Sequence, residues 1–147
     1  MTSPHRQRVL FLCTQNSARS QMSEGWLRHL AGDDFEVESA GTAPASRVHP
    51  LAVRVMQEAA INISGQQPKS VDRLVAQPFD YVITVCDRAR DDCPVFPQAG
   101  SQLHWGIDDP AAVQGTLAAR LAAFRRTCDE IAARVRSLLA DRPSTQP

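Results

Sequence analysis

A cysteine and an arginine stand six positions apart near the start of the chain, separated by small and polar residues. Cys13 and Arg19 frame the segment Cys-Thr-Gln-Asn-Ser-Ala-Arg-Ser, which ends at Ser20. Five residues wrapped into a loop can point successive backbone N–H groups at one centre and form a nest for a tetrahedral oxyanion. A helix that begins at the end of the loop adds the positive end of its dipole. The spacing therefore predicts an oxyanion-binding loop.

Several side chains in this loop have chemistry that suits an anion and a nucleophile. The planar guanidinium of Arg19 can bond two anion oxygens at once. The same positive field favours the thiolate form of Cys13, which would attack the central atom. Asn16 suits a left-handed backbone position, and the Ser20 hydroxyl can donate to the thiolate. We expect the anion to contact the loop residues Thr14, Gln15, Asn16, Ser17, Ala18, Arg19 and Ser20.

A plainer interpretation of the same segment is a buried cysteine followed by a polar turn that caps a helix. The C-x5-R spacing alone occurs by chance in many unrelated chains. Its neighbours favour the anion loop. Val9–Leu12 is a continuous apolar run typical of a buried strand, and Ser17–Leu30 has helical periodicity.

The other three cysteines differ in their surroundings. Cys86 ends an apolar run, and Cys93 follows it across a polar, charged connection that we expect to be exposed and mobile. Both are also open to a plain structural interpretation. A zinc site of Cys86, Cys93 and His104 fits no usual ligand spacing, so no metal is predicted. Cys128 lies on the apolar stripe of the last helix and is predicted to be a core residue.

Length and composition narrow the class of protein. The 147 residues fit one domain, 1–147, with about 1–7 and 141–147 as flexible tails. Sixteen basic and sixteen acidic side chains cancel, which argues against a nucleic-acid binder. No apolar run is long enough to span a bilayer, and no signal peptide is recognised. We expect a cytoplasmic monomer. In the reducing cytoplasm an even number of cysteines does not imply structural disulfides.

Hydrophobic patterning predicts strands that alternate with helices. The expected strands are 9–12, 35–39 (an edge strand), 80–86 and 103–107, and the expected helices are 17–30, 50–60, 71–75 and 109–140. This order predicts an α/β fold with a single doubly wound, four-stranded parallel sheet flanked by helices. Because parallel strands end at one edge of the sheet, Cys13, Cys86 and Asp109 are expected to converge there.

Longer segments give a more specific signal than the loop. The run from Val9 to Leu27 resembles the thioredoxin-coupled arsenate reductases, which share the fold of the low-molecular-weight protein tyrosine phosphatases. The resemblance covers nearly the whole chain except its ends. It extends to the segments Glu38-Ser39-Ala40-Gly41-Thr42, Tyr81-Val82-Ile83-Thr84-Val85-Cys86, Cys93-Pro94 and His104-Trp105-Gly106-Ile107-Asp108-Asp109-Pro110. The family usually has glycine at Gln15 and often cysteine at Ala18.

The resemblance implies a relay of three thiols with arsenate as substrate, thioredoxin as partner and no cofactor. Cys13 attacks arsenic, and Asp109 acts as general acid, although Asp109 before Pro110 is also a plausible helix N-cap. Cys86 then forms a disulfide with Cys13 as arsenite leaves. Cys93 carries the disulfide outward, where thioredoxin reduces it.

Three rival functions remain open at this stage. A tyrosine phosphatase on the same scaffold typically carries tyrosines after the Asp-Pro pair, whereas here the only tyrosine is Tyr81. A reductase that uses a small thiol would not need Cys93. An oxyanion-binding or sensor protein would not need the relay.

The resemblance also bears on a cation. Some arsenate reductases bind potassium beside the anion loop, and Asn16, Glu24 and Ser39 match positions that contribute to that site. The remaining carboxylate position aligns with Lys69. An ammonium near Glu24 would repel a bound alkali ion, whereas the plainer interpretation of Lys69 is a solvated side chain.

Overall fold

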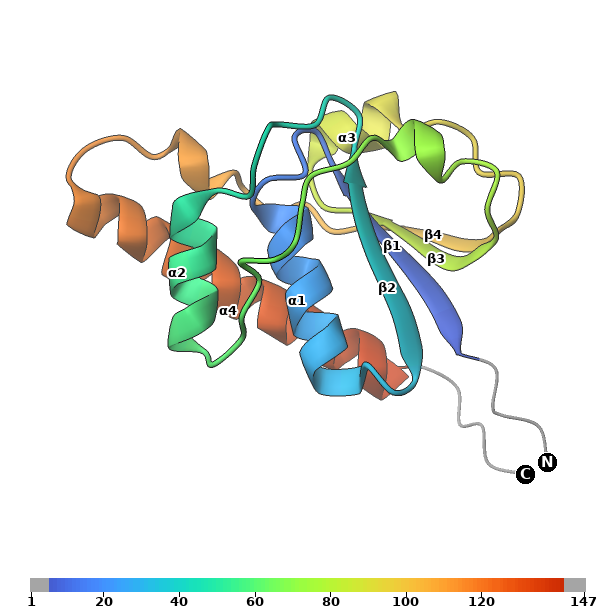
Figure 1. The fold of residues 1–147 in the computed structure, drawn as a ribbon, viewed down its shortest axis with the longest axis horizontal. Helices are drawn as coiled ribbons and strands as arrows, with labels where there is room; N and C mark the ends of the chain where they lie inside the picture. The colour runs from blue at the N-terminus through green and yellow to red at the C-terminus, as the bar shows by residue number, and fades with distance from the viewer. Residues whose placement is uncertain (1–5, 142–147) are drawn as a thin grey trace.

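Four parallel strands form one sheet at the centre of the molecule (Figure 1). The computed structural model describes residues 6–141; the predicted tail residues 1–5 and 142–147 lie outside the described residues. The strands are β1 (Gln7–Cys13), β2 (Phe35–Gly41), β3 (Phe79–Thr84) and β4 (Ala99–His104), in the order β2-β1-β3-β4. Every neighbouring pair is parallel, and β2 is an edge strand as expected.

Strand β1 is buried on both faces, as its apolar run predicts. Val9 and Phe11 pack into one core cluster, while Leu10 and Leu12 pack into the other, and all four are 0% exposed. This alternation follows from the two-residue period of a strand. Because Cys13 continues the Val9 side, its sulfur is directed to the face that the long helices cover.

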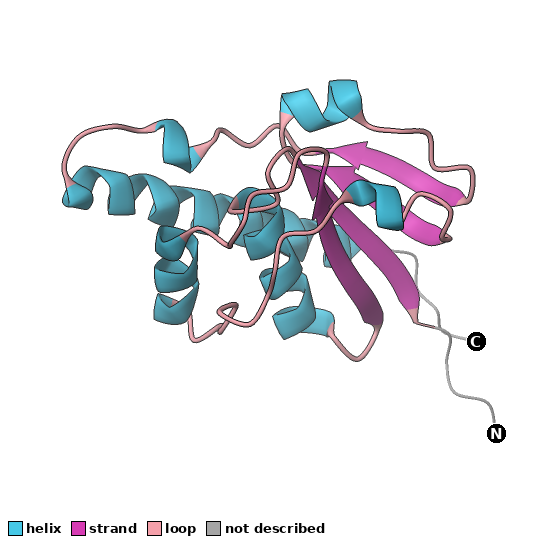
Figure 2. Ribbon diagram, turned by 45° about the horizontal axis from the view of Figure 1, so that its top comes forward, coloured by secondary structure: helices cyan, strands magenta, loops and turns pink. Residues whose placement is uncertain are grey.

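The two faces of the sheet are covered unequally (Figure 2). Helices α1 (Arg19–Ala31), α2 (Pro50–Glu58) and α4 (Leu117–Asp141) lie together on one face. The short 3-10 helix η1 (Val71–Arg73) and loop residues such as Phe96 cover the other face. The α/β fold class with a four-stranded parallel sheet is confirmed. None of the described helices is long and apolar enough to cross a membrane.

Several expected elements differ from the structure, beginning with the helix expected at 71–75, which is only the 3-10 helix η1 (Val71–Arg73). Strand β4 ends at His104, and the apolar residues Trp105 and Ile107 are buried in the irregular segment after it. The β4 residues are mostly exposed, so they carry no apolar pattern to detect. Helix α4 begins at Leu117 because a separate 3-10 helix, η2 (Pro110–Ala112), is followed by Gly115 at φ +117°. The charged connection expected to be mobile forms a short helix, α3 (Asp87–Asp92).

Candidate active site

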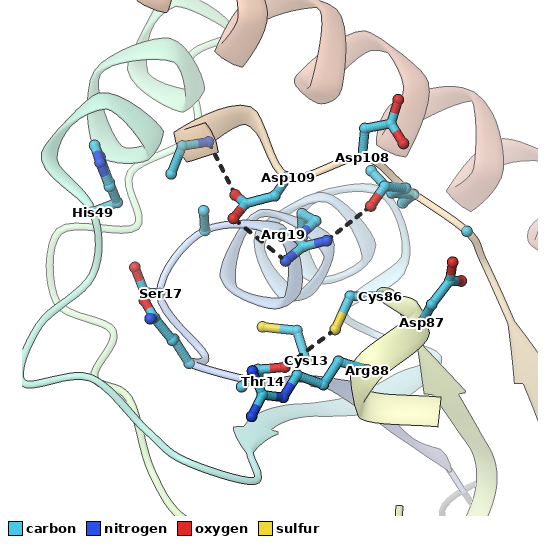
Figure 3. A pocket seen from close by; sticks show the side chains of 15 residues that line it. Cys13, Thr14, Ser17, Arg19, His49, Cys86, Asp87, Arg88, Asp108 and Asp109 are labelled. Carbon is cyan, nitrogen blue, oxygen red and sulfur yellow. Dashed lines mark hydrogen bonds and ion pairs between the residues drawn. The ribbon is translucent and has the colours of Figure 1, made fainter. Parts of the chain in front are cut away.

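A cavity of about 440 Å³ opens at the carboxyl ends of β1 and β3 (Figure 3). It is lined by Cys13, Arg19, Cys86 and Asp109, together with other residues of the 13–19 loop. The topology therefore brings together the residues that the sequence predicts to converge. Cys93 does not line this cavity.

The backbone of the loop is held from outside by the segment that follows β2. The carbonyls of Thr14 and Gln15 each accept a backbone N–H at 2.8 Å, from Ala43 and Ala45. The Ser17 carbonyl accepts the N–H of His49, also at 2.8 Å. In a trans peptide the next N–H points away from the carbonyl, so these peptides turn their N–H groups inward. This geometry supports the anion nest that the spacing predicts.

The Cys13 sulfur lies at the base of this nest. The backbone N–H of Asn16 donates to Sγ at 3.2 Å, and the Ser20 Oγ lies 2.9 Å from it. The Asn16 amide donates to the same Ser20 Oγ at 2.8 Å. Asn16 has φ +52° and is fully buried, which confirms its predicted left-handed conformation.

Two supports of the nest were not identified from the sequence. The backbone carbonyl oxygen of Asn16 accepts a hydrogen bond from the Gln21 side chain at 2.9 Å. The side-chain Oδ1 of Asn16 accepts one from the backbone N–H of Lys69 at 3.0 Å. Gly41 lies directly beneath the loop, where an added Cβ would come within 2.5 Å of the Thr14 carbonyl oxygen. A larger residue at this position would displace the loop.

Helix α1 begins at the cavity without a side-chain cap. Ala18 occupies the N-cap position and makes no capping hydrogen bond. The first N–H groups of a helix have no partner within it, so this end can bind an anion. Gln15 is exposed and adopts a negative φ, so its side chain does not force the loop into the left-handed region.

Arg19 and Asp109 lie next to each other at the cavity and form an ion pair. The Arg19 Nη1 donates to the Ile107 carbonyl at 2.9 Å, and its Nη2 lies 3.9 Å from Asp109 Oδ2. The other carboxylate oxygen of Asp109 accepts the Ala111 N–H at 2.9 Å. Asp109 is therefore the N-cap of η2 and also an ion-pair partner of Arg19. Its Oδ1 makes the capping contact and its Oδ2 faces Arg19.

Cys86 is buried beside the same cavity at the N-terminus of α3. Its Sγ accepts the Ala89 N–H at 3.3 Å and lies 3.5 Å from Thr14 Oγ1. Cys13 and Cys86 both line this cavity, as Figure 3 shows. The cavity is therefore lined by two free thiols and by residues of the 13–19 loop.

Cys93 lies at the other end of α3 and packs against the opposite core cluster. Its Sγ donates to the Pro94 carbonyl at 3.3 Å, and partial burial raises the pKa of this thiol. Cys128 is buried in the core, as predicted, where it accepts a hydrogen bond from Trp26 Nε1 at 3.3 Å. Burial also raises the pKa of Cys128.

Sequence reasoning missed two further residues that line the cavity, His49 and Arg88. His49 Nδ1 accepts the Leu51 N–H at 3.1 Å, and its ring packs on Phe124. Burial, followed by the positive charge of Arg120, lowers the pKa of His49.

The candidate potassium residues do not fit an alkali ion. Both carboxylate oxygens of the buried Glu24 are engaged: Oε1 accepts from Ser39 at 2.5 Å, and Oε2 pairs with Arg28 at 2.6 Å. The Lys69 ammonium lies 3.4 Å from Glu38 instead. The cation near Glu24 is thus Arg28, which corrects the expectation for Lys69. Among residues 6–141, no cluster of three or more His, Cys, Asp or Glu side chains is arranged to hold a metal.

Comparison with known proteins identifies the family of this chain. Residues 8–145 match the family described as low molecular weight phosphotyrosine protein phosphatase. The chain belongs to this family. Within the phosphatase family, it is 45% identical over 129 residues to a protein named arsenate reductase from Halalkalibacterium halodurans. That match covers 88% of this chain and 92% of the relative.

Solved structures agree with this assignment. One is described as an arsenate reductase in the phosphate binding state; it matches with a TM-score of 0.79 at 32% identity, over 91% of this chain and 97% of that one. A thioredoxin-dependent arsenate reductase from Corynebacterium glutamicum matches with a TM-score of 0.70 at 34% identity, over 95% of this chain and 63% of that one. The resemblance to the arsenate reductases of the phosphatase family is confirmed, and so is the expectation of an enzyme.

Proposed function

We propose that this protein reduces arsenate to arsenite through a relay of three cysteines and is re-reduced by thioredoxin. The observation that carries the proposal is the presence of Cys13 and Cys86 as free thiols that line one cavity. Hydrolysis of a phosphate ester needs only one nucleophile, whereas a two-electron reduction needs two thiols that become a disulfide.

Arsenate binds first, as a tetrahedral oxyanion, in the nest of residues 13–19. The inward N–H groups and the uncapped start of α1 receive its oxygens. Arg19 turns its remaining donors toward the anion while Nη1 stays bound to Ile107. The Cys13 thiolate, supported by Ser20 and the Asn16 N–H, faces the central arsenic.

The first chemical step forms a sulfur–arsenic bond. Cys13 attacks arsenic, and an arsenate oxygen leaves as water after Asp109, the general acid, donates a proton. Arsenic remains As(V) in the resulting thiol adduct. The contact of Asp109 with Arg19 holds the carboxyl at the cavity, where it takes up a proton from solvent or from the bound arsenate and passes it to the leaving oxygen.

The second step reduces arsenic. The Cys86 thiolate attacks the Cys13 sulfur, the sulfur–arsenic bond breaks, and its electron pair stays on arsenic, which leaves as arsenite, As(III). The two thiols become a Cys13–Cys86 disulfide. Cys93 then attacks Cys86 and releases Cys13, which moves the disulfide to Cys86–Cys93. The α3 segment between them must rearrange for this transfer.

Thioredoxin closes the cycle by donating two electrons to the Cys86–Cys93 disulfide. The described relative from Corynebacterium glutamicum is named thioredoxin-dependent, which supports this partner. The reaction suits a monomer acting in a reducing cytoplasm, where thioredoxin is kept reduced. No cofactor is required, because thiols supply both electrons.

The competing function is a phosphotyrosine phosphatase, which the family membership favours. The Asp-Pro pair is followed here by Ala111 and Ala112, which offer no aromatic surface for a tyrosine ring. The test is arsenate-dependent NADPH oxidation in the presence of thioredoxin and thioredoxin reductase, set beside p-nitrophenyl phosphate hydrolysis. We expect the first activity to exceed the second. Hydrolysis without arsenate reduction would establish the phosphatase instead.

A further inference from the structure

His104 bridges the two segments on either side of Cys86. Its Nδ1 lies 2.8 Å from the Oγ1 of Thr84, the last residue of β3. Its Nε2 lies 2.7 Å from an oxygen of Asp87, the first residue of α3. His104 itself ends β4, so one imidazole ties the ends of two strands to the start of a helix. Figure 3 shows Asp87 and Cys86 as neighbours at this helix start.

The donors and acceptors of this bridge are satisfied in either charge state of the imidazole. A carboxylate only accepts hydrogen bonds, so Nε2 carries the proton shared with Asp87. In the neutral ring, the Thr84 hydroxyl donates to Nδ1. In the charged ring, Nδ1 donates to Thr84, whose hydroxyl then turns to the Leu103 carbonyl at 3.4 Å.

The two contacts of His104 differ in exposure to solvent. Thr84 is buried, whereas the Asp87 side chain is 73% exposed. Water screens an exposed pair, so the contact between His104 and Asp87 adds only modest stability. A contact of this kind can position the helix start and still open during a catalytic cycle.

Helix α3 depends on such anchors because it is only six residues long. Isolated helices of this length are unstable in water. Its ion pairs Arg88–Asp92 and Arg90–Asp91 are internal and do not fix it to the sheet. Within α3, the described anchors are the buried Ala89 and the Asp87 contact with His104. The second of these lies next to Cys86.

We propose that His104 is a positioning residue for the relay, a role that rests on the function proposed above. Through Asp87 it holds the first turn of α3, so the Cys86 sulfur stays in the cavity while arsenite forms. Release of this contact then frees α3 for disulfide transfer. In that transfer the Cys93 thiolate bonds to the Cys86 sulfur, the Cys13–Cys86 bond breaks, and Cys13 leaves as a thiolate without net oxidation or reduction.

The first experiment measures the helix itself, in the reduced protein without arsenate. Hydrogen exchange of the Ala89 and Arg90 amides, which bond to Cys86, should be about fivefold faster in His104→Ala and in Asp87→Ala. The control Asp91→Ala removes a carboxylate of α3 that does not contact β4 and should leave this exchange unchanged. The double variant with His104→Ala and Asp87→Ala should exchange these amides no faster than either single variant.

The second experiment resolves the two chemical steps by rapid quenching, alkylation and disulfide mapping. In His104→Ala, arsenite formation should slow and the transfer from Cys13–Cys86 to Cys86–Cys93 should accelerate, each by about fivefold. A merely structural role would slow both steps. His104→Gln, whose amide N–H can reach Asp87, should restore both rates toward those of the unmodified protein.

The outcomes separate this inference from the function it rests on. Unchanged amide exchange in His104→Ala, or a slowing of both chemical steps, would overturn the positioning role. Absence of arsenite formation in the unmodified protein would overturn the proposed function, while the exchange measurement would still decide whether His104 holds α3.

Discussion

The Sγ of Cys13 lies 2.9 Å from the Oγ of Ser20, and that oxygen already accepts a hydrogen bond from the Asn16 side chain. The Asn16 bond occupies an acceptor site of the Ser20 hydroxyl and leaves its proton free to point at the sulfur. The Asn16 N–H is a second donor directed at the same sulfur.

Replacing Ser20 with alanine should therefore slow the reactions of Cys13 at neutral pH. A hydrogen bond to a charged group contributes about 1.5–3 kcal/mol, which corresponds to about a ten- to hundredfold loss in rate. The measurements are alkylation of Cys13 by iodoacetamide and arsenite formed in a single turnover. Ser23→Ala removes a hydroxyl one turn later that bonds to the Arg19 carbonyl, and it serves as the control. Equal effects from both variants would contradict the assignment.

Replacing Cys93 with serine should allow one turnover and then stop the enzyme. Cys93 packs on the far side of the sheet from the cavity, so the first disulfide forms without it. Mass mapping of the stalled protein should find Cys13 joined to Cys86. Continuous turnover with thioredoxin would show that the first disulfide is reduced directly.

The buried Cys128 provides the matched control for that experiment. Cys128→Ala should lower stability because it leaves a cavity and an unpaired Trp26 N–H. The number of thiols lost per turnover should stay at two, because Cys128 is remote from the relay. Thiol titration before and after one turnover measures this number.

The site could be predicted from the sequence where local chemistry specifies it. The buried strand β1 could be predicted because a strand that is buried on both faces needs a continuous run of apolar residues. The left-handed conformation of Asn16 could be predicted because asparagine adopts it more readily than most residues. The convergence of Cys13 with Cys86 follows from parallel topology.

The rest depends on contacts between segments distant in sequence. His104 meets Asp87 only because β4 ends beside α3, and no spacing rule predicts that pair. Helix α3 escaped detection because its capping acceptor is a cysteine sulfur and its residues are almost all charged. The sequence left open whether Lys69 lies near Glu24 or is solvated; in the structure Arg28, one helical turn away on α1, pairs with Glu24.

The end of α2 offers a test of backbone strain. Ala60 has φ +62°, a left-handed conformation that costs an L-residue free energy and suits glycine after a helix. Ala60→Gly should raise the free energy of unfolding by about 0.5–1 kcal/mol, measured by urea denaturation. Ala59→Gly is the control, because Ala59 has a negative φ and its substitution should lower stability. Destabilisation by both would contradict this reasoning.

Val95 lies two residues after Cys93, and 81% of it is exposed. In the proposed relay thioredoxin must approach Cys93, and an exposed apolar side chain beside that thiol suits such an approach. Val95→Asp should raise the KM for thioredoxin by about fivefold and leave arsenite formation in a single turnover unchanged. Leu117→Asp, at the start of α4, changes a similarly exposed residue and is the control. Equal KM values for thioredoxin in both variants would show that Val95 does not contact thioredoxin.

The environment of Glu24 leads to a prediction about salts. This carboxylate is buried, and Arg28 and Ser39 together engage both of its oxygens. A buried charge that already has a cationic partner gains little from a second cation, which the guanidinium would repel. The guanidinium of Arg28 thus supplies a positive charge beside Glu24 from within the chain.

The unmodified protein should therefore have the same arsenate reductase activity and the same Tm in potassium and sodium chloride at equal ionic strength. Arg28→Ala should lower the Tm, because it leaves the Glu24 carboxylate buried without a cation. Potassium should then restore about 3 °C more than sodium does, since an ion that binds only the folded state stabilises it. Arg125→Ala, which breaks an exposed pair with Glu58, should show no such difference between the salts. A stimulation of the unmodified protein that is specific to potassium would show that Arg28 does not replace the ion.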